Sequence, residues 1–384
     1  MQSNKRHLDF LDLLRGVAIL SVFAFHAMLI AFTKDQLPWG HWFVDVKAGK
    51  SILPLFPVTL GWAGVAIFFV VSGFCINLSF SNGRPGDWAG FFTRRFFRIY
   101  PPYVLALLLF AFFFPLTAHA FATADDWKSL GLHGALLYNF TSYFYSFNAA
   151  FWSIAVEAQL YLLYPLLMLI VGKMGWQRAL IITGGIEFAM RGASAIFFTL
   201  KGDHLPHWFS GSPFFFWFSW SIGAALAAAY IEKRPLPFTT RGPGFWLALA
   251  VASTLAKPLE SFSFAFFALA TASYIARYLQ ADSLPAQAGF LRKHLSFLGT
   301  VSYSFYLLHM PVITWLAHLY RQHGVMINRT YLMFAVCLST YFIILFGSWL
   351  YYKVIELPSI ALGKQFLKNW KAAAIESAAL SHPE

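Results

Sequence analysis

The sequence predicts an all-α membrane protein, a polytopic bundle of about ten transmembrane helices. Its 384 residues are 59% hydrophobic, 20% aromatic and only 11% charged, whereas about a quarter of the residues in a soluble protein are charged. The apolar residues gather in runs of roughly 20, which is the length that crosses a hydrocarbon core of about 30 Å. Lys and Arg separate these runs. Composition and pattern together argue against a soluble enzyme.

Ten apolar runs are expected to be the spans, and the seventh and eighth are interrupted by Lys257-Pro258, so that they form either two spans or one re-entrant pair. An even number of spans places both termini on one side, and most of the 28 Lys and Arg residues fall on that side, which predicts cytoplasmic termini. The runs are 12 to 32, 60 to 80, 100 to 120, 150 to 171, 177 to 199, 212 to 231, 243 to 258, 260 to 279, 297 to 318 and 330 to 352.

Charge and cysteine usage exclude several other classes of protein. The net charge of +12 does not indicate a nucleic-acid partner, because the basic residues flank apolar runs and form no single basic face. Cys75 and Cys337 both lie within apolar stretches, so we expect neither a disulfide framework nor a metal site. The first run lacks a cleavage site and is expected to be retained. We expect a single membrane domain over 1–384, with its core at about 7–364 and no fused soluble domain.

Ionisable side chains inside the spans are the informative residues. Each costs about 2.5 to 3.5 kcal/mol at the middle of a membrane helix, so it needs a partner or a function. They are Asp12, Arg15, His26, Glu157, Glu187, Arg191, His309 and Glu356.

The first run carries a candidate catalytic face. Asp12 and Arg15 are three residues apart and can pair. His26 follows Arg15 by eleven residues, close to three full turns, so both lie on one face about 16 Å apart along the axis. His26 could simply be hydrogen-bonded to a neighbouring helix, but its alignment with Arg15 favours a general base in an apolar cavity.

Two further clusters stand near span ends. Arg95 and Arg98 share one face of a helical turn and form a forked cationic site suited to phosphate, although a basic cluster at the cytoplasmic entrance of a span can also be only a topological anchor. In the fourth run, Ser153, Glu157 and Tyr161 follow one stripe. Such a stripe can hold helices together, but the carboxylate favours a functional role.

The other intramembrane charges are expected to be structural. Glu187 and Arg191 are spaced as a self-satisfying pair on one helix. His309 and Glu356 lie near helix ends, where such groups are usually satisfied by hydrogen bonds.

Six blocks resemble the acyltransferase 3 family of integral membrane acyltransferases, and they occur in the same order as in that family. Two positions depart from the pattern: Ala66 stands where the family commonly has an aspartate, and Ala158 where many members have a second glutamate. The departures place more weight on Asp12 and Glu157. The matching blocks are 11 to 16 followed by His26, 64 to 74, 95 to 101, 152 to 165, 301 to 311 and 355 to 358.

The resemblance implies an O-acyltransferase of the bacterial inner membrane. It would move an acyl group, by expectation acetyl, from cytosolic acyl-CoA to a hydroxyl of a carbohydrate such as an envelope polysaccharide, a lipid-linked glycan or a glycoside, without a metal. His26 would act either as the general base or as an acyl relay. The other implied site residues are Glu157 and Asp12 for catalysis, Arg15, Arg95 and Arg98 for acyl-CoA, and Trp152, Ser153 and Tyr161 for the acceptor.

The main alternative is a transporter or flippase of lipid-linked sugars, which would also surround a midplane cavity with charges. Such proteins usually contain two corresponding halves, and the sequence has no second copy of the spacing between Arg15 and His26. A scaffold that has lost activity is disfavoured by the intact candidate site. A homo-oligomer is compatible with the sequence.

Overall fold

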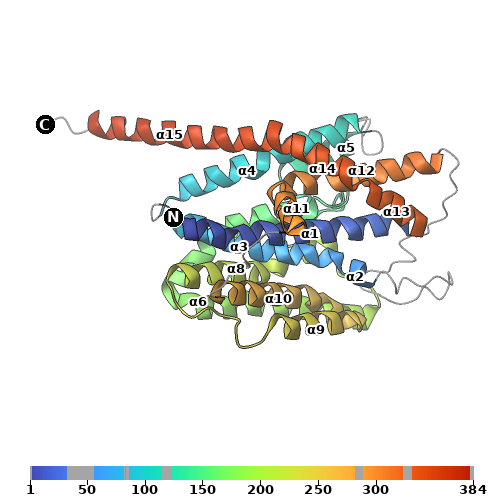
Figure 1. The fold of residues 1–384 in the computed structure, drawn as a ribbon, viewed down its shortest axis with the longest axis horizontal. Coiled ribbons are helices and arrows are strands. Elements are labelled where there is room, and N and C mark those ends of the chain that lie inside the picture. The colour runs from blue at the N-terminus through green and yellow to red at the C-terminus, as the bar shows by residue number, and fades with distance from the viewer. Residues whose placement is uncertain are drawn as a thin grey trace.

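The computed structural model describes residues 2–32, 56–81, 83, 86–114, 121, 123–281, 289–322 and 331–380, and within these ranges it contains helices and turns but no strand. The predicted all-α class is confirmed, and most of the helices run alongside one another (Figure 1). In chain order they are α1 (Gln2–Ala31), α2 (Phe56–Thr59), η2 (Gly61–Ala63), α3 (Gly64–Ser81), α4 (Trp88–Leu108), η3 (Leu109–Phe113), α5 (Ala124–Gly134), η4 (Tyr138–Phe140), α6 (Trp152–Lys201), α7 (His207–Ser210), η5 (Pro213–Phe216), α8 (Trp217–Ile231), α9 (Pro243–Thr254), η6 (Lys257–Leu259), α10 (Glu260–Gln280), α11 (Phe290–Thr300), α12 (Ser302–Gln322), α13 (Tyr331–Ser339), α14 (Tyr341–Tyr351), η7 (Tyr352–Glu356) and α15 (Leu357–Leu380).

Seven helical stretches of the described chain are long and apolar enough to cross a membrane. One of them, α6, spans 50 residues and has non-helical dihedrals at Gly175, with φ 78° and ψ 166°. Trp152 and Phe198, near its two ends, line the same cavity, so the chain folds back at Gly175. Two predicted spans, 150 to 171 and 177 to 199, correspond to these two arms. The total of ten spans stays a prediction. The seven stretches are Asp9–Ala31, Gly61–Ser81, Trp88–Phe113, Trp152–Lys201, Pro213–Ile231, Glu260–Gln280 and Tyr331–Ala373.

Three predicted boundaries are wrong. The third span begins at Trp88, not at residue 100, because Asp87 caps the helix by accepting a hydrogen bond from the Gly90 N–H at 3.0 Å. Its arginines consequently lie inside α4. The ninth run is divided, since α11 ends at Thr300 and α12 begins at Ser302. The seventh run ends early, because helix α9 stops at Thr254 and not at residue 258. It therefore has only 12 residues, about 18 Å, and it packs against α10.

Helix α1 lies within the bundle and contacts α3, α11, α12 and α13. Its crossing with α11 is very close, because a Cβ atom at Gly16 would collide with the carbonyl of Leu295, and one at Gly299 with the carbonyl of Asp12. Small residues allow backbones to approach in this way within membranes. The crossing fixes the part of α1 that carries Asp12 and Arg15 against α11, just before the start of α12.

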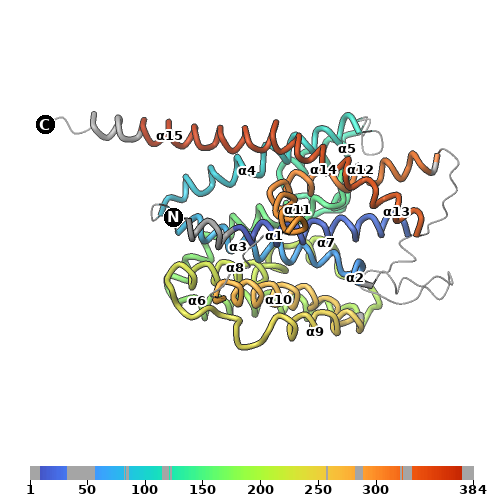
Figure 2. The backbone as a smooth tube through the Cα atoms, in the orientation of Figure 1, coloured from blue at the N-terminus to red at the C-terminus, as the bar shows by residue number. Residues whose placement is uncertain are grey.

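The C-terminal helix α15 runs alongside α4 (Figure 2). A Cβ atom at Gly363 would collide with the side chain of Phe97, and Lys371 bonds Asp87 at 2.9 Å. Helix α1 begins and α15 ends at the same end of the bundle (Figure 1). The cytoplasmic placement of this end stays a prediction.

Candidate active site

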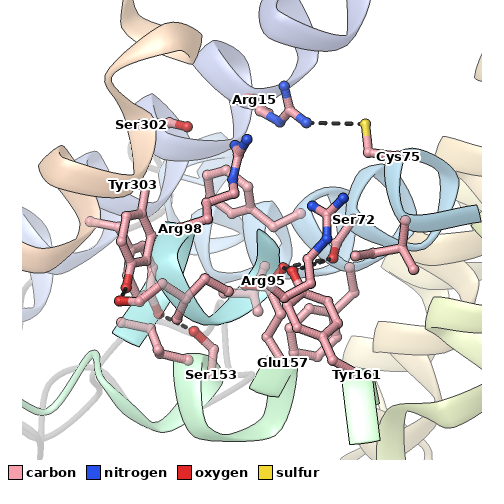
Figure 3. A pocket seen from close by; sticks show the side chains of 17 residues that line it. Arg15, Ser72, Cys75, Arg95, Arg98, Ser153, Glu157, Tyr161, Ser302 and Tyr303 are labelled. Carbon is pink, nitrogen blue, oxygen red and sulfur yellow. Dashed lines mark hydrogen bonds between the residues drawn. The ribbon is translucent and has the colours of Figure 1, made fainter. Parts of the chain in front are cut away.

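Three guanidinium groups line one cavity of about 790 Å³, which we call the arginine cavity. Arg15 comes from α1, and Arg95 and Arg98 come from α4 (Figure 3). The structure thus brings together all three residues that the sequence predicts for the donor. Helices α3, α6 and α12 complete the wall.

The three arginines differ in how their donors are used. Arg15 binds Asp12 at 2.6 Å and donates to the Cys75 sulfur at 3.1 Å. Arg95 and Arg98 make no hydrogen bond or ion pair within the described part of the chain, and the Nε atom of Arg95 is buried without a partner. The guanidinium of Arg95 lies 6.0 Å from the Phe91 ring centre. Two cationic groups therefore face the cavity with their donors available.

Glu157 contributes the carboxylate of the arginine cavity. Its Oε1 atom accepts hydrogen bonds from Ser72 and from Tyr161, both at 2.6 Å. The indole of Trp220 donates in turn to the Ser72 hydroxyl at 3.3 Å. The predicted contact of Glu157 with His26 is wrong, because this hydrogen-bond network directs the carboxylate toward α3 and the arginines.

Asp12 also lies apart from His26. It forms the ion pair with Arg15 and lines a small polar cavity with Arg98 and Glu356. Glu356 is only 2% exposed and accepts a hydrogen bond from Ser304 at 2.7 Å, as expected for a satisfied group. The short spacing of Asp12 and Arg15 favours their mutual pairing over any contact of Asp12 with the His26 imidazole, which lies nearly four turns away.

His26 contacts His309, a pairing that no sequence pattern indicated. The Nδ1 atom of His26 lies 2.9 Å from Nε2 of His309. The Nδ1 atom of His309 lies 2.8 Å from the Tyr306 carbonyl oxygen and 3.2 Å from that of Phe305. Carbonyl oxygens only accept, so this Nδ1 carries a proton. In a neutral pair, His309 Nε2 then accepts from His26 Nδ1, and the lone pair of His26 Nε2 is left available.

A second cavity of about 1160 Å³ contains His26, and we call it the histidine cavity. The two cavities follow one another along α1, since Arg15 lines the first and Val22, Phe25 and His26 line the second. They share two lining residues, Val65 and Tyr306. The histidine cavity is rich in aromatic rings, which include Phe25, Trp62, Trp152, Phe216, Phe264 and Tyr306.

The comparison with known families decides the class of this arrangement. A family model described as an acyltransferase domain matches residues 8–353. The chain belongs to the acyltransferase 3 family. It is therefore an O-acyltransferase, and the transporter alternative loses its support.

Two relatives cover most of this acyltransferase. Acyltransferase MdmB of Streptomyces mycarofaciens is 27% identical over 316 residues, which cover 78% of this chain and 77% of that protein. Nodulation protein 10 of Rhizobium leguminosarum bv. viciae is 27% identical over 352 residues, which cover 81% of this chain and 86% of that protein. An uncharacterized protein of Haemophilus influenzae is 32% identical over 124 residues, 28% of this chain and 49% of that protein. No solved structure matches the chain significantly.

The predicted acceptor residues of the acyltransferase are divided between its cavities. Trp152 lines the histidine cavity, where its ring packs 5.6 Å from that of Phe216. Ser153 and Tyr161 line the arginine cavity instead. Successive helical residues point in different directions, so Trp152 and Ser153 face different spaces.

The Glu187–Arg191 pair is structural, as predicted. Both side chains are almost completely buried, at 0% and 1% exposure, and their atoms approach to 2.9 Å. Arg191 also donates to the carbonyl oxygens of Ser261 and Phe215. Glu187 accepts from the Ser219 N–H at 2.9 Å and its hydroxyl at 2.6 Å. The pair ties the second arm of α6 to α8 and α10 beside the histidine cavity.

Proposed function

We propose that this acyltransferase moves an acyl group from cytosolic acyl-CoA, with acetyl-CoA as the expected donor, to a carbohydrate hydroxyl. The adjacency of the arginine and histidine cavities carries this proposal. One cavity offers cations with unused donors, the other offers an imidazole among aromatic rings, and the two share a wall at Val65 and Tyr306. The proposal uses no metal.

The donor is assigned to the arginine cavity. Phosphate groups suit guanidinium forks, which bind them through paired charge-assisted hydrogen bonds. Arg95 and Arg98 form no ion pair with a carboxylate in the described chain. The pantetheine arm of CoA is long and thin, so its phosphates can remain beside the arginines while the thioester reaches toward His26.

The acceptor is assigned to the histidine cavity. Aromatic rings such as Trp62 and Trp152 provide flat apolar faces on which sugar rings can stack. His204 and Ser210 line the same space and add polar groups that can bind hydroxyls. In the predicted topology, the end of α1 that carries His26 lies toward the side opposite to the termini, where an envelope polysaccharide or lipid-linked glycan would be met.

His26 is the proposed general base. Its Nε2 atom takes the proton of the acceptor hydroxyl while that oxygen attacks the thioester carbonyl carbon. The carbon–sulfur bond breaks, and the departing CoA thiolate takes the proton from His26. His309 acts as a positioning residue, because its Nε2 accepts from His26 Nδ1 and keeps the other nitrogen directed at the substrate.

The central test measures CoA release by purified protein with acetyl-CoA and a panel of sugars. We expect His26→Ala to abolish transfer while donor binding is largely retained. His207→Ala is the matched control, because His207 lies in the neighbouring α7 and lines neither cavity. Full activity of His26→Ala would refute the catalytic assignment.

A second measurement separates direct transfer from an acyl-histidine relay. Without acceptor, direct transfer predicts no rapid release of CoA. A relay predicts a burst of CoA stoichiometric with the enzyme. A burst in the wild-type protein that disappears in His26→Ala would replace direct transfer by the relay.

A further inference from the structure

Val65 and Tyr306 mark the boundary between the two cavities. None of the three arginines of the arginine cavity lines the histidine cavity, and His26 does not line the arginine cavity. Val65 and Tyr306 line both, and each is only 6% exposed. The two cavities therefore adjoin at these two side chains. We call this junction the neck.

The Tyr306 side of the neck is held firmly. Its hydroxyl donates to the Ala150 carbonyl oxygen at 2.7 Å and accepts from the Ser153 hydroxyl, also at 2.7 Å. Its ring meets the Phe68 ring edge-on, with centres 6.1 Å apart. Its own carbonyl oxygen binds His309 at 2.8 Å. Ring, backbone and histidine pair are thus fixed together.

The Val65 side is equally constrained. Val65 follows Gly64, where a Cβ atom would collide with the carbonyl of Ala18, so α3 begins pressed against α1. Valine has few accessible rotamers in a helix. The branched side chain therefore cannot easily turn away to widen the passage.

We propose that the acyl group passes between Val65 and Tyr306 on its way to His26, and that this neck selects the group by its cross-section. This inference rests on the proposed function. Straight acyl chains have the same cross-section whatever their length, and the histidine cavity beyond the neck is the space for the acceptor and the chain together. A branch next to the carbonyl widens the group at the point that must come closest to His26. Branching should thus reduce transfer more than length does.

The test compares acetyl-CoA, butyryl-CoA and isobutyryl-CoA as donors to one acceptor sugar. Val65→Ala should raise the ratio of isobutyryl to butyryl transfer about tenfold, the lower end of what methyl-sized differences provide in a pocket. Val71→Ala is the matched control on the same helix, because Val71 is 1% exposed and lines neither cavity. It should leave the ratio unchanged.

Val65→Phe tests the neck in the opposite direction. Narrowing the passage should lower the transfer of every acyl group about 100-fold, because the thioester is held short of His26. The affinity for CoA itself should stay within about twofold, since CoA phosphates bind the arginines. Should Val65→Phe fail to fold, Val65→Ala still decides the question.

Two results would overturn the neck while the proposed function stands. One is an active wild-type protein in which Val65→Ala and Val71→Ala give the same isobutyryl to butyryl ratio. The other is a folded Val65→Phe that transfers acetyl at the wild-type rate. A wild-type protein that uses none of the acyl-CoA donors would overturn the proposed function and the neck together.

Discussion

Arg191 and Arg95 both place a guanidinium group inside the helical bundle, but they differ in their hydrogen bonds. Arg191 is 1% exposed, uses its donors on Glu187 and two carbonyl oxygens, and lies 4.5 Å from the Phe215 ring centre. Arg95 makes no hydrogen bond or ion pair in the described chain, and its Nε atom is buried without a partner. A buried guanidinium with a partner at every nitrogen belongs to the structure of the fold, whereas one with unused donors is available to bind a ligand.

The largest effect is expected on stability, when the buried ion pair of Arg191 is broken. Glu187→Ala leaves Arg191 as an uncompensated buried charge, which should cost about 3 to 5 kcal/mol of stability. We expect a large fall in the midpoint of thermal unfolding in detergent. The double variant Glu187→Ala/Arg191→Leu removes both charges and should recover much of the loss. Wild-type stability of Glu187→Ala alone would contradict the structural assignment.

Arg95→Ala should behave in the opposite way. We expect the affinity for CoA to fall about 10- to 100-fold, since a charge-assisted hydrogen bond contributes about 1.5 to 3 kcal/mol. Thermal stability should barely change, because no internal partner loses its bond. Isothermal titration with CoA measures the affinity, and thermal unfolding measures the stability. Arg94→Ala is the control, because Arg94 lies 3.7 Å from Asp87 and does not line the arginine cavity.

Glu157→Gln tests how the negative charge in the arginine cavity affects CoA binding. The amide oxygen can still accept from Ser72 and Tyr161, so the fold should be kept. Removing the negative charge should strengthen CoA binding by a few-fold, roughly 1 kcal/mol or less. If Glu157 instead served His26 directly, kcat would fall strongly with CoA affinity unchanged. Steady-state kinetics and titration on the same preparation separate these outcomes.

The smallest effect is expected at Asp87, outside the spans. The hydrogen bond from Lys371 holds the pKa of Asp87 below its usual value. The carboxylate therefore stabilises the fold above its unfolded pKa of about 3.9, and this contribution disappears as the pH falls through the lowered pKa. Lys371→Ala should cost about 0.5 kcal/mol at pH 7. Its difference from wild type in unfolding temperature should vanish in acid; a difference that persists there would exclude this ion pair as the cause.

Helical periodicity was enough to predict one structural ion pair and part of the candidate site. Glu187 and Arg191 pair because four residues separate them, and Arg95 and Arg98 share a cavity because three do. Such contacts within one helix follow from helix geometry alone. The helical class likewise followed from apolar runs of membrane length.

Contacts between helices could not be predicted from the same patterns. His309 and His26 are 283 residues apart in the sequence, and only the packing of α12 against α1 brings them together. Glu157 was expected near His26, but its direction is set by Ser72 on another helix. The break before Ser302 comes directly after the tight crossing at Gly299, which no local preference reveals.

Because Arg15 and His26 belong to the same uninterrupted helix, α1 fixes the distance between the arginine cavity, which Arg15 lines, and the proposed base His26. The distance is about 16 Å along the axis, and it cannot be shortened without breaking the helix. A donor whose acyl group is attached directly to phosphate, such as acetyl phosphate, would be held at the arginines, too far from His26 to react. We therefore expect acetyl phosphate to occupy the arginines and compete with acyl-CoA without being consumed.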